Sequence, residues 1–326
     1  MRKPSTWIRI LVSVILLALL LRQAGAQNVV ERLRQMNPWD FAIALGLYLL
    51  GVWLRSWRWQ GLLDAVGYHG RLGRLTELYF VGTFFNQILP TGIGGDVVRV
   101  YETAKDGAGT ANAASSVVVD RATGLITLMA MALVTLGIAM VVRPGVVDPG
   151  VAMVILLVSG GVVVGMIAML EADRLRGILA RIPLVGQWLD KPGVRAFTES
   201  FQMYKGPALN KALLVSIVFN FQLVATNYFL GQGLGVNALM DAPILYSLLF
   251  IPIISFVLAL PISISGLGAR EAAYVALFGS VGVPSDQALA LSLSFYAVNL
   301  ITGAIGGVLY VVSGLRGGRD AVSAEK

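Results

Sequence analysis

The sequence contains no cysteine and a single histidine, His69, among its 326 residues. The lack of cysteine excludes disulfides and thiolate catalysis, and one histidine cannot assemble a cysteine-and-histidine metal site. An intramembrane serine protease needs a histidine inside the bilayer, whereas His69 lies in a polar, arginine-containing stretch. We therefore expect no catalytic residues, no metal centre and no other cofactor.

Charged residues are also scarce, at 13% of the chain against about 25% in soluble domains, while 56% of the residues are apolar. No Walker-type phosphate loop occurs, which excludes that mode of ATP use. The Gly-x-Gly-Asp motif of intramembrane aspartic proteases is missed, because residues 93–96 read Ile-Gly-Gly-Asp. The net charge is +7, and in a membrane protein such an excess of Lys and Arg is explained by the cytoplasmic loops, which collect positive residues. We therefore expect no nucleic-acid partner.

Long apolar runs predict an all-α polytopic membrane protein that forms a single membrane domain over residues 1–326. Six of these runs predict full membrane spans. These full spans cover residues 7–21, 39–54, 117–142, 151–170, 212–234 and 288–313. The first run also has features of a cleavable signal peptide, which stays an alternative. Residues 171–211 mix basic and apolar side chains and predict a cytoplasmic amphipathic connector.

Two further apolar runs, 75–101 and 242–279, are interrupted by proline and glycine. Such breaks in mid-run predict re-entrant hairpins of two half-helices. Both breaks read Leu-Pro, four residues, Gly, three residues and Arg, at a constant offset of 171 residues. The order span, span, hairpin, span also occurs twice, which predicts two inverted repeats over 1–142 and 151–313 with opposed hairpins. The alternative is two unrelated glycine-rich kinks.

The distribution of positive residues predicts the orientation of the chain. With the amino terminus in the cytoplasm, 20 of the 25 Lys and Arg residues fall on the cytoplasmic side. Because cytoplasmic loops collect positive residues, we expect both termini on that side of a bacterial or archaeal cytoplasmic membrane.

The hairpins carry the chemistry that we expect to be functional. Each break places glycine amides at the start of a half-helix and an arginine, Arg99 or Arg270, in its first turns, which is an arrangement suited to phosphate. Opposed hairpins would point both sites at one central region. The candidate substrate-binding residues are Asn86, Gly94, Gly95, Asp96, Arg99, Asp120, Arg121, Ser265, Gly266, Arg270 and Glu271.

Structural roles are open for several of these residues. First-turn acids such as Asp96 and Glu271 often cap helices. An ionised arginine inside a membrane is rarely idle, but Arg99 and Arg270 could be held by nearby acids. Outside this set, Arg55 and Arg58 alternate with tryptophans and are typical of an anchor at the inner leaflet, with attraction of anionic lipid there as the alternative.

Three segments together resemble one family, the transmembrane region of lysylphosphatidylglycerol synthase/flippase and its stand-alone relatives. They are residues 85–99, residues 116–121 and the most specific stretch, residues 261–272, which reads Pro-Ile-Ser-Ile-Ser-Gly-Leu-Gly-Ala-Arg-Glu-Ala. The resemblance covers nearly the whole chain. Tyr296 is followed by Ala297, where many relatives carry arginine.

The resemblance implies a lipid translocase without a catalytic domain, with Asp96, Arg99, Arg121, Arg270 and Glu271 in a head-group cavity. The expected ligand is the head group of an anionic or phosphate-headed lipid: a phospholipid, an aminoacyl-phospholipid or a polyprenyl phosphate. A lipid-synthesising enzyme or a glycosyltransferase is a possible partner. A non-transporting scaffold for a lipid-modifying enzyme, or an intramembrane enzyme, is the alternative.

Overall fold

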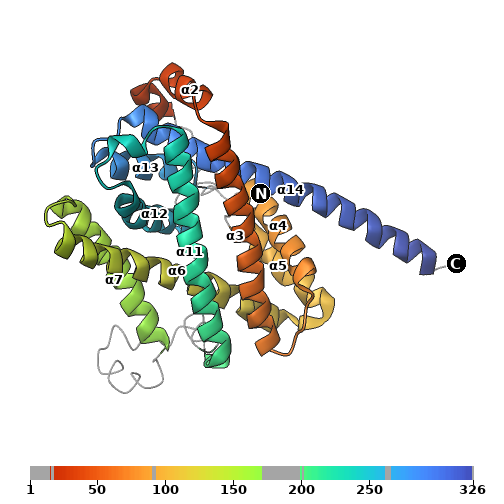
Figure 1. Cartoon of the computed structure of the whole chain (residues 1–326). Coiled ribbons are helices and arrows are strands. Elements are labelled where there is room, and N and C mark those ends of the chain that lie inside the picture. The colour runs from red at the N-terminus through yellow and green to blue at the C-terminus, as the bar shows by residue number, and fades with distance from the viewer. Residues whose placement is uncertain are drawn as a thin grey trace.

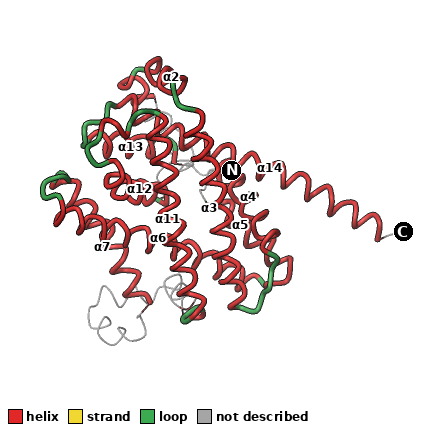
Figure 2. The backbone as a smooth tube through the Cα atoms, viewed as in Figure 1, coloured by secondary structure: helices red, strands yellow, loops and turns green. Residues whose placement is uncertain are grey.

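The computed structural model describes residues 15, 18–89, 93–170, 199, 202–260 and 266–324, with side chains as far as residue 167 in the third of these ranges and residue 313 in the last. Every regular element within these residues is helical, and helices make up 86% of the structure, which confirms the all-α fold class (Figures 1 and 2). Short loops join most of the helices (Figure 2). The helices are α2 (Ala26–Arg34), α3 (Pro38–Ala65), α4 (Leu72–Ile88), α5 (Gly94–Thr103), η1 (Ala104–Ala108), α6 (Thr110–Val142), α7 (Pro149–Leu170), α11 (Pro207–Gly233), η2 (Asn237–Leu239), α12 (Pro243–Ala259), α13 (Ala269–Gly279) and α14 (Ser285–Ala324).

Four of the described helices are long and apolar enough to cross a membrane, namely α6, α7, α11 and α14. A fifth span results if α2 and α3, which meet at 87°, are counted as one bent span. The six spans of the sequence prediction therefore correspond to four or five in this part of the chain. Residues 7–14, 16 and 17 of the predicted first span, and most of the connector at 171–211, lie outside the described residues.

Helices α3 and α11 lie side by side along most of their lengths and form the centre of the molecule (Figure 1). Asp40 faces Gly233 at one end of the pair, and Gly61 faces Lys211 at the other. Residue numbers rise along one helix as they fall along its neighbour, so the two helices run antiparallel. Pro38 and Pro207 stand at their amino ends, where the missing proline N–H leaves no hydrogen bond unmade.

Helices α4 and α5 form an antiparallel hairpin. Gly82 packs against Gly95 near the tip, and Arg74 forms an ion pair with Glu102 at the open end. The Asn86 side chain accepts a hydrogen bond of 2.8 Å from the Gly95 amide and so ties the two helices together at the turn. Residues 90–92 of the predicted break lie outside the described residues.

Helices α12 and α13 form a second antiparallel hairpin. Leu258 contacts Gly266 near the tip, and the rings of Phe250 and Phe278 pack edge to face further along. Gly266 has a φ of 77°, a left-handed conformation that favours glycine. Residues 261–265 lie outside the described residues, so nothing is placed here for the predicted Ser265.

Helix α14 contacts both hairpins near their tips. Its residue Tyr296 stacks on Arg270 of the second hairpin, and Asn299 accepts a hydrogen bond of 2.5 Å from Gln87 of the first through its backbone oxygen. Asn299 is the third residue after Tyr296, which is about 4.5 Å further along a helix.

The open ends of the hairpins lie in opposite directions along α14. Ser313 of α14 is hydrogen-bonded to Glu77 near the open end of the first hairpin, whereas the second hairpin opens into the short turn that precedes Ser285. On the α4 side, Gly306 lies against the backbone carbonyl of Phe80, so these two helices touch through their main chains. The two hairpins therefore approach the middle of α14 from opposite ends.

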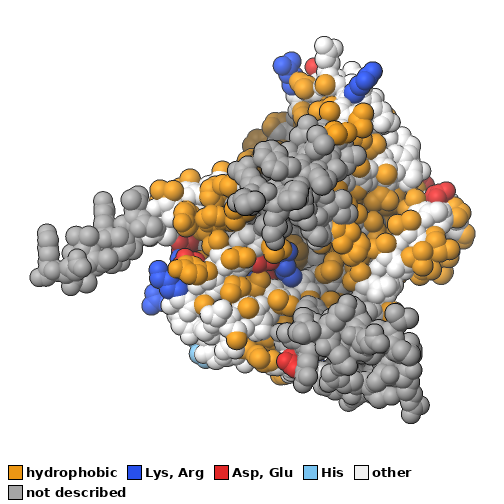
Figure 3. Space-filling view, turned by 180° about the vertical axis from the view of Figure 1, so that it is seen from behind, with side chains coloured by type: hydrophobic (Ala, Val, Ile, Leu, Met, Phe, Trp, Pro, Cys, Tyr) orange, Lys and Arg blue, Asp and Glu red, His pale blue; other side chains and the backbone are white. Residues whose placement is uncertain are grey.

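The outer surface is largely apolar. Apolar side chains cover much of the face shown in Figure 3, and the charged groups visible there form small clusters. Helix α7 is the least buried of the candidate spans, because only 17% of its 18-residue apolar stretch is buried. Its side chains Leu157 and Val164 are exposed. Such an exposed apolar surface is what a bilayer would cover.

Candidate functional site: an arginine-rich pocket between the hairpins and α3

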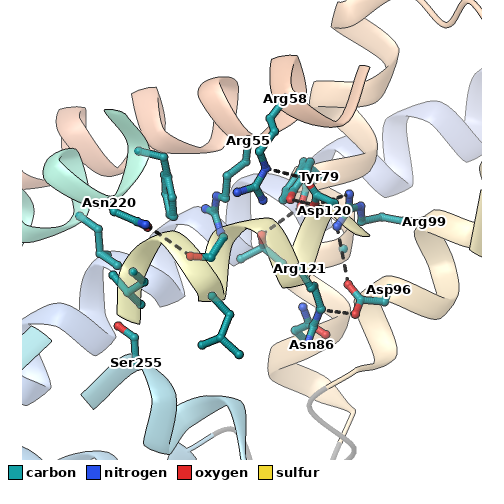
Figure 4. Close-up of a pocket in the computed structure, with 17 residues that line it drawn as sticks. Arg55, Arg58, Tyr79, Asn86, Asp96, Arg99, Asp120, Arg121, Asn220 and Ser255 are labelled. Carbon is teal, nitrogen blue, oxygen red and sulfur yellow. Dashed lines mark hydrogen bonds and ion pairs between the residues drawn. The ribbon is translucent and has the colours of Figure 1, made fainter. Parts of the chain in front are cut away.

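A pocket of about 260 Å³ lies where the first hairpin meets the central helices (Figure 4). Its volume is below the roughly 300–1,000 Å³ of sites for drug-sized ligands, so it suits a head group better than a whole lipid. Helices α3, α4, α5, α6, α11 and α12 all contribute to its wall. The lining residues are Arg55, Arg58, Tyr79, Gly82, Thr83, Asn86, Asp96, Arg99, Asp120, Arg121, Gly124, Leu125, Leu128, Phe219, Asn220, Leu223 and Ser255.

Asp120 is the most deeply buried acid of the pocket, and two arginines hold it. Arg58 donates to one carboxylate oxygen at 2.8 Å, and Arg99 donates to the other at 3.0 Å. The Tyr79 hydroxyl donates to this second oxygen as well. Arg58 and Arg99 are each only 3% exposed, and their charges are partly balanced by this one carboxylate. Several donors around one buried carboxylate offset the cost of removing it from water.

Asp96 is the second acid and lies nearer the mouth of the pocket. It stands in the first turn of α5, where a negative side chain also favours the helix dipole. Its carboxylate forms ion pairs with Arg121 of α6 and, at 3.6 Å, with Arg99. Figure 4 shows Arg121 reaching across to Asp96 beside Asn86. The Arg121 side chain is 43% exposed, so this pair stands where the buried interior meets the outside.

Arg55 differs from the other three arginines, because within the described part of the chain it forms no ion pair. Its Nε donates to the Gly51 carbonyl at 3.2 Å, and its buried Nη2 has no hydrogen-bond partner. The guanidinium lies over the rings of Phe219, Tyr79 and Tyr48, at 4.9, 5.3 and 5.6 Å from the ring centroids. Aromatic faces hold a cation in place without neutralising it.

The opposite wall of the pocket is apolar. Leu125 and Leu128 of α6 and Leu223 of α11 line it, and Ser255 marks its edge on α12. Figure 4 shows Ser255 and Asn220 at the end of the pocket away from Asp96. A charged floor beside an apolar wall matches a ligand with a charged head and an apolar body.

Arg270 and Glu271 form a separate buried cluster in the second hairpin. Arg270 donates to Glu271 at 2.6 Å, and Ser292 of α14 lies 3.3 Å from both side chains. Glu271 also accepts a hydrogen bond of 2.6 Å from the Gly268 amide at the start of α13, which gives it the capping role that the sequence left open. The Arg270 guanidinium lies 4.4 Å from the Tyr296 ring centroid.

The structure brings part of the predicted site together. Asn86, Asp96, Arg99, Asp120 and Arg121 all line one pocket, although Asp120 and Arg121 pair with other residues rather than with each other. The remaining described candidates do not line it; these are Gly94, Gly95, Gly266, Arg270 and Glu271.

Sequence reasoning missed Arg55 and Arg58 as pocket residues. The prediction of an interfacial anchor is wrong for Arg58, which is buried against Asp120, and Arg55 faces the pocket. The neighbouring Trp53 and Trp57 are exposed and stacked on each other, so the tryptophan pattern describes the other face of α3. Helical spacing carried the missing signal, because residues 55, 58 and 59 share a face, and Trp59 is fully buried.

Comparison with known proteins identifies the family. The family model described as the transmembrane region of lysylphosphatidylglycerol synthase matches residues 6–307. The chain belongs to this family. The match confirms the resemblance and covers every residue of the pocket.

A curated relative is the protein named glycosyltransferase AglD from Haloferax volcanii. It is 26% identical over 337 aligned positions, which cover 92% of this chain and 53% of the relative. The chain therefore spans about half the length of the curated relative that it matches. No solved structure was found to match the chain.

The pocket offers ionic and hydrogen-bonding chemistry. In the described residues no group of three or more histidine, cysteine, aspartate or glutamate side chains could hold a metal ion. Both acids are engaged by arginines, and four guanidinium groups face or line one small space. Such a space can hold an anion through charge-assisted hydrogen bonds.

Proposed function

We propose that this membrane protein is a lipid translocase that moves an anionic or phosphate-headed lipid between the leaflets of the cytoplasmic membrane. The observation that carries the proposal is the pocket that places four arginines beside an apolar wall, inside a body with an apolar surface. Ionisable side chains are costly within a bilayer and usually mark the path of a substrate. Family membership supports the same class of function.

The arrangement of the two hairpins supports a mechanism of alternating access. Their tips contact α14 one turn apart, and they open toward its opposite ends. Transporters built from inverted repeats with broken helices hold their substrate between the repeats and expose it to each side in turn. We propose that the hairpins are re-entrant, that they belong to inverted repeats over 1–142 and 151–313, and that both termini are cytoplasmic.

In the proposed cycle the head group enters past Asp96 and Arg121 while the lipid tails stay in the bilayer. Arg121 is the more exposed partner of this pair, so an arriving anion can compete with Asp96 for it. Arg99 contacts both acids and is placed to link the mouth of the pocket with its floor. We propose that Arg270 and Glu271 act from the second hairpin by positioning its tip against α14.

Reconstitution tests this function. Purified protein in liposomes with fluorescent phosphatidylglycerol is expected to speed leaflet exchange, measured by the fraction of label accessible to dithionite. Arg99→Ala is expected to reduce the rate at least tenfold, whereas Arg143→Ala, at an exposed ion pair with Asp241, should leave it unchanged. Exchange no faster than with an unrelated membrane protein of similar size would contradict the proposal. Equal rates for Arg99→Ala and the unsubstituted protein would contradict the role of the pocket.

A second candidate function is favoured by the named relative. The relative is called a glycosyltransferase and is about twice as long as the region that matches this chain. A membrane protein that presents a lipid to a glycosyltransferase partner, without moving it across the membrane, would share the same pocket. That function predicts a stable enzyme that co-purifies with the chain and no leaflet exchange by the purified protein.

A further inference from the structure

The charges of the pocket do not balance. Four arginines, Arg55, Arg58, Arg99 and Arg121, line it together with two acids, Asp96 and Asp120. The pocket therefore holds two positive charges in excess. Excess charge is costly in a buried site of low dielectric constant, so an excess of this kind favours a ligand of matching negative charge.

Both acids are already fully engaged. Asp120 accepts hydrogen bonds from Arg58, Arg99 and Tyr79, and Asp96 is paired with Arg121 and Arg99. Neither carboxylate is left to receive an ammonium group. A zwitterionic or cationic head group, including an aminoacylated one, would place its positive charge among arginines without a partner.

Two guanidinium groups of the pocket carry buried nitrogens without a hydrogen-bond partner in the described part of the chain. The buried Nη2 of Arg55 and the buried Nε of Arg99 have no hydrogen-bond partner within the described residues. Arg99 is 3% exposed, so its free donor has no bulk water to satisfy it. Buried polar groups are nearly always hydrogen-bonded, and an unmatched one calls for a bound group.

Aromatic rings fix both of these arginines. Tyr79 lies under both guanidinium groups, at 5.3 Å from Arg55 and 3.9 Å from Arg99, measured from each Cζ to the ring centroid. Trp59 also flanks Arg99, at 4.1 Å. Both free donors therefore belong to guanidinium groups that contact the same ring, which preorganises them for a single anion.

We infer that the pocket selects a phosphate monoester, a head group with two negative charges, over a phosphate diester with one. This inference rests on the proposed function and narrows its substrate class. Arg55 is the specificity residue, because it is the one pocket arginine that has no carboxylate partner in the described chain. A monoester has three terminal oxygens and can accept from Arg55 and Arg99 together.

Equilibrium binding tests the inference directly. The protein in phosphatidylcholine nanodiscs is titrated with dioctanoyl phosphatidic acid, a monoester, and with dioctanoyl phosphatidylglycerol, a diester with the same tails. At pH 7.5 we expect the monoester to bind at least about tenfold more tightly, because its second negative charge is also attracted by the excess positive charge of the pocket. At pH 5 the monoester has lost most of its second charge, since its second pKa is about 6, and the preference should fall to about threefold or less.

Substitutions place the preference at Arg55. Arg55→Gln is expected to bring the two affinities within about threefold at pH 7.5, and Arg55→Lys to retain most of the preference because the charge remains. Arg143→Gln is the matched control, since it removes an arginine outside the pocket. A thermal midpoint for Arg55→Gln close to that of the unsubstituted protein shows that it folds. An unchanged preference in Arg55→Gln, or no preference in the unsubstituted protein, would overturn the inference.

Two further arms separate the possible failures. Inorganic phosphate is expected to displace the monoester lipid only at concentrations at least about a hundredfold above the Kd of the lipid. Displacement at concentrations equal to that Kd would overturn the inference that the ligand is a lipid. Leaflet exchange is measured on the same preparations. Exchange without a monoester preference overturns the inference and leaves the translocase, whereas tight monoester binding without exchange supports the inference and contradicts the translocase.

Discussion

Gly95 leaves no room for a side chain, because the backbone carbonyl of Gly82 occupies the place where its Cβ would stand. This contact brings α4 and α5 together through their main chains. It also sets the aliphatic stem of Arg99, one turn further along α5, against Gly82. The position of Arg99 in the pocket thus depends on two glycines thirteen residues apart in the sequence.

The first prediction concerns this contact. Gly95→Ala should force α4 and α5 apart and destabilise the protein by about 1–3 kcal/mol, as overpacked sites usually do. The measurement is the thermal midpoint in detergent by tryptophan fluorescence. Gly137→Ala on α6 is the control, because a Cβ there meets no atom within 4 Å, and it should keep or raise the midpoint. Equal midpoints for the two variants would show that the close approach is not needed.

The second prediction concerns the buried acid. Asp120→Asn leaves Arg58 and Arg99 without their shared countercharge, and removing one partner of a buried pair costs about 3–5 kcal/mol. We expect a lower yield of folded protein and a clear drop in thermal midpoint. Asp241→Asn breaks an exposed pair with Arg143 and should cost no more than about 1 kcal/mol. A similar loss in both variants would argue against the burial of Asp120.

The third prediction concerns Asp96 at the mouth of the pocket. Asp96→Asn raises the excess charge of the pocket from two to three and removes the carboxylate that pairs with Arg121. Phosphatidylglycerol should then bind several-fold more tightly and cross more slowly, because release becomes the slow step. Binding and exchange are measured on the same vesicles. Asp106→Asn, which removes an acid at the open end of the hairpin, should change neither. Weaker binding in Asp96→Asn would mean that the carboxylate itself contacts the ligand.

The fourth prediction concerns the direction of the hairpins in the membrane. The sequence has no cysteine, so single cysteines can be labelled without a background. A membrane-impermeant maleimide should reach Lys105→Cys, at the open end of the first hairpin, from the cytoplasmic side. It should reach Ser280→Cys, beyond the second hairpin, from the opposite side. Labelling of both positions from one side would contradict the inverted arrangement.

The sequence predicted the all-α fold class and the positions of the two helix breaks because their signals are local; the re-entrant, inverted arrangement of the hairpins stays a prediction. Proline and glycine clustered in mid-run favour the end of a helix, and α5 and α13 begin at Gly94 and Ala269, close to the predicted breaks. A single proline does not have this effect, since Pro252 lies inside α12. The spans on α6 and α7 were likewise visible as continuous apolar runs, with boundaries that differ by at most seven residues.

The pocket could be predicted only in part because its contacts are remote in sequence. Arg99 and Asp120 belong to neighbouring segments, and both were predicted as site residues because they are charged side chains within a membrane chain. Arg58 lies 62 residues from its partner Asp120, and the tryptophans around it gave a stronger local signal for a membrane interface. We expected Arg99 and Arg270 to face one central region because of the symmetry of the hairpins. Arg270 instead forms an ion pair with the next residue, Glu271, in a separate cluster.

The glycines of α14 determine which parts of the protein can shift relative to one another. Gly306 rests on the main chain of Phe80, and a backbone contact of this kind allows neither sliding nor rotation without steric overlap. Helices α4 and α14 are therefore expected to travel as one rigid body. The contact between α13 and α14 is made by Arg270, Ser292 and Tyr296, whose hydrogen bond and ring stacking can break and re-form after a small displacement. A conformational change would then act at the contact between α13 and α14, which makes the second hairpin the moving element and would shift the Ser255 edge of the pocket relative to its arginines.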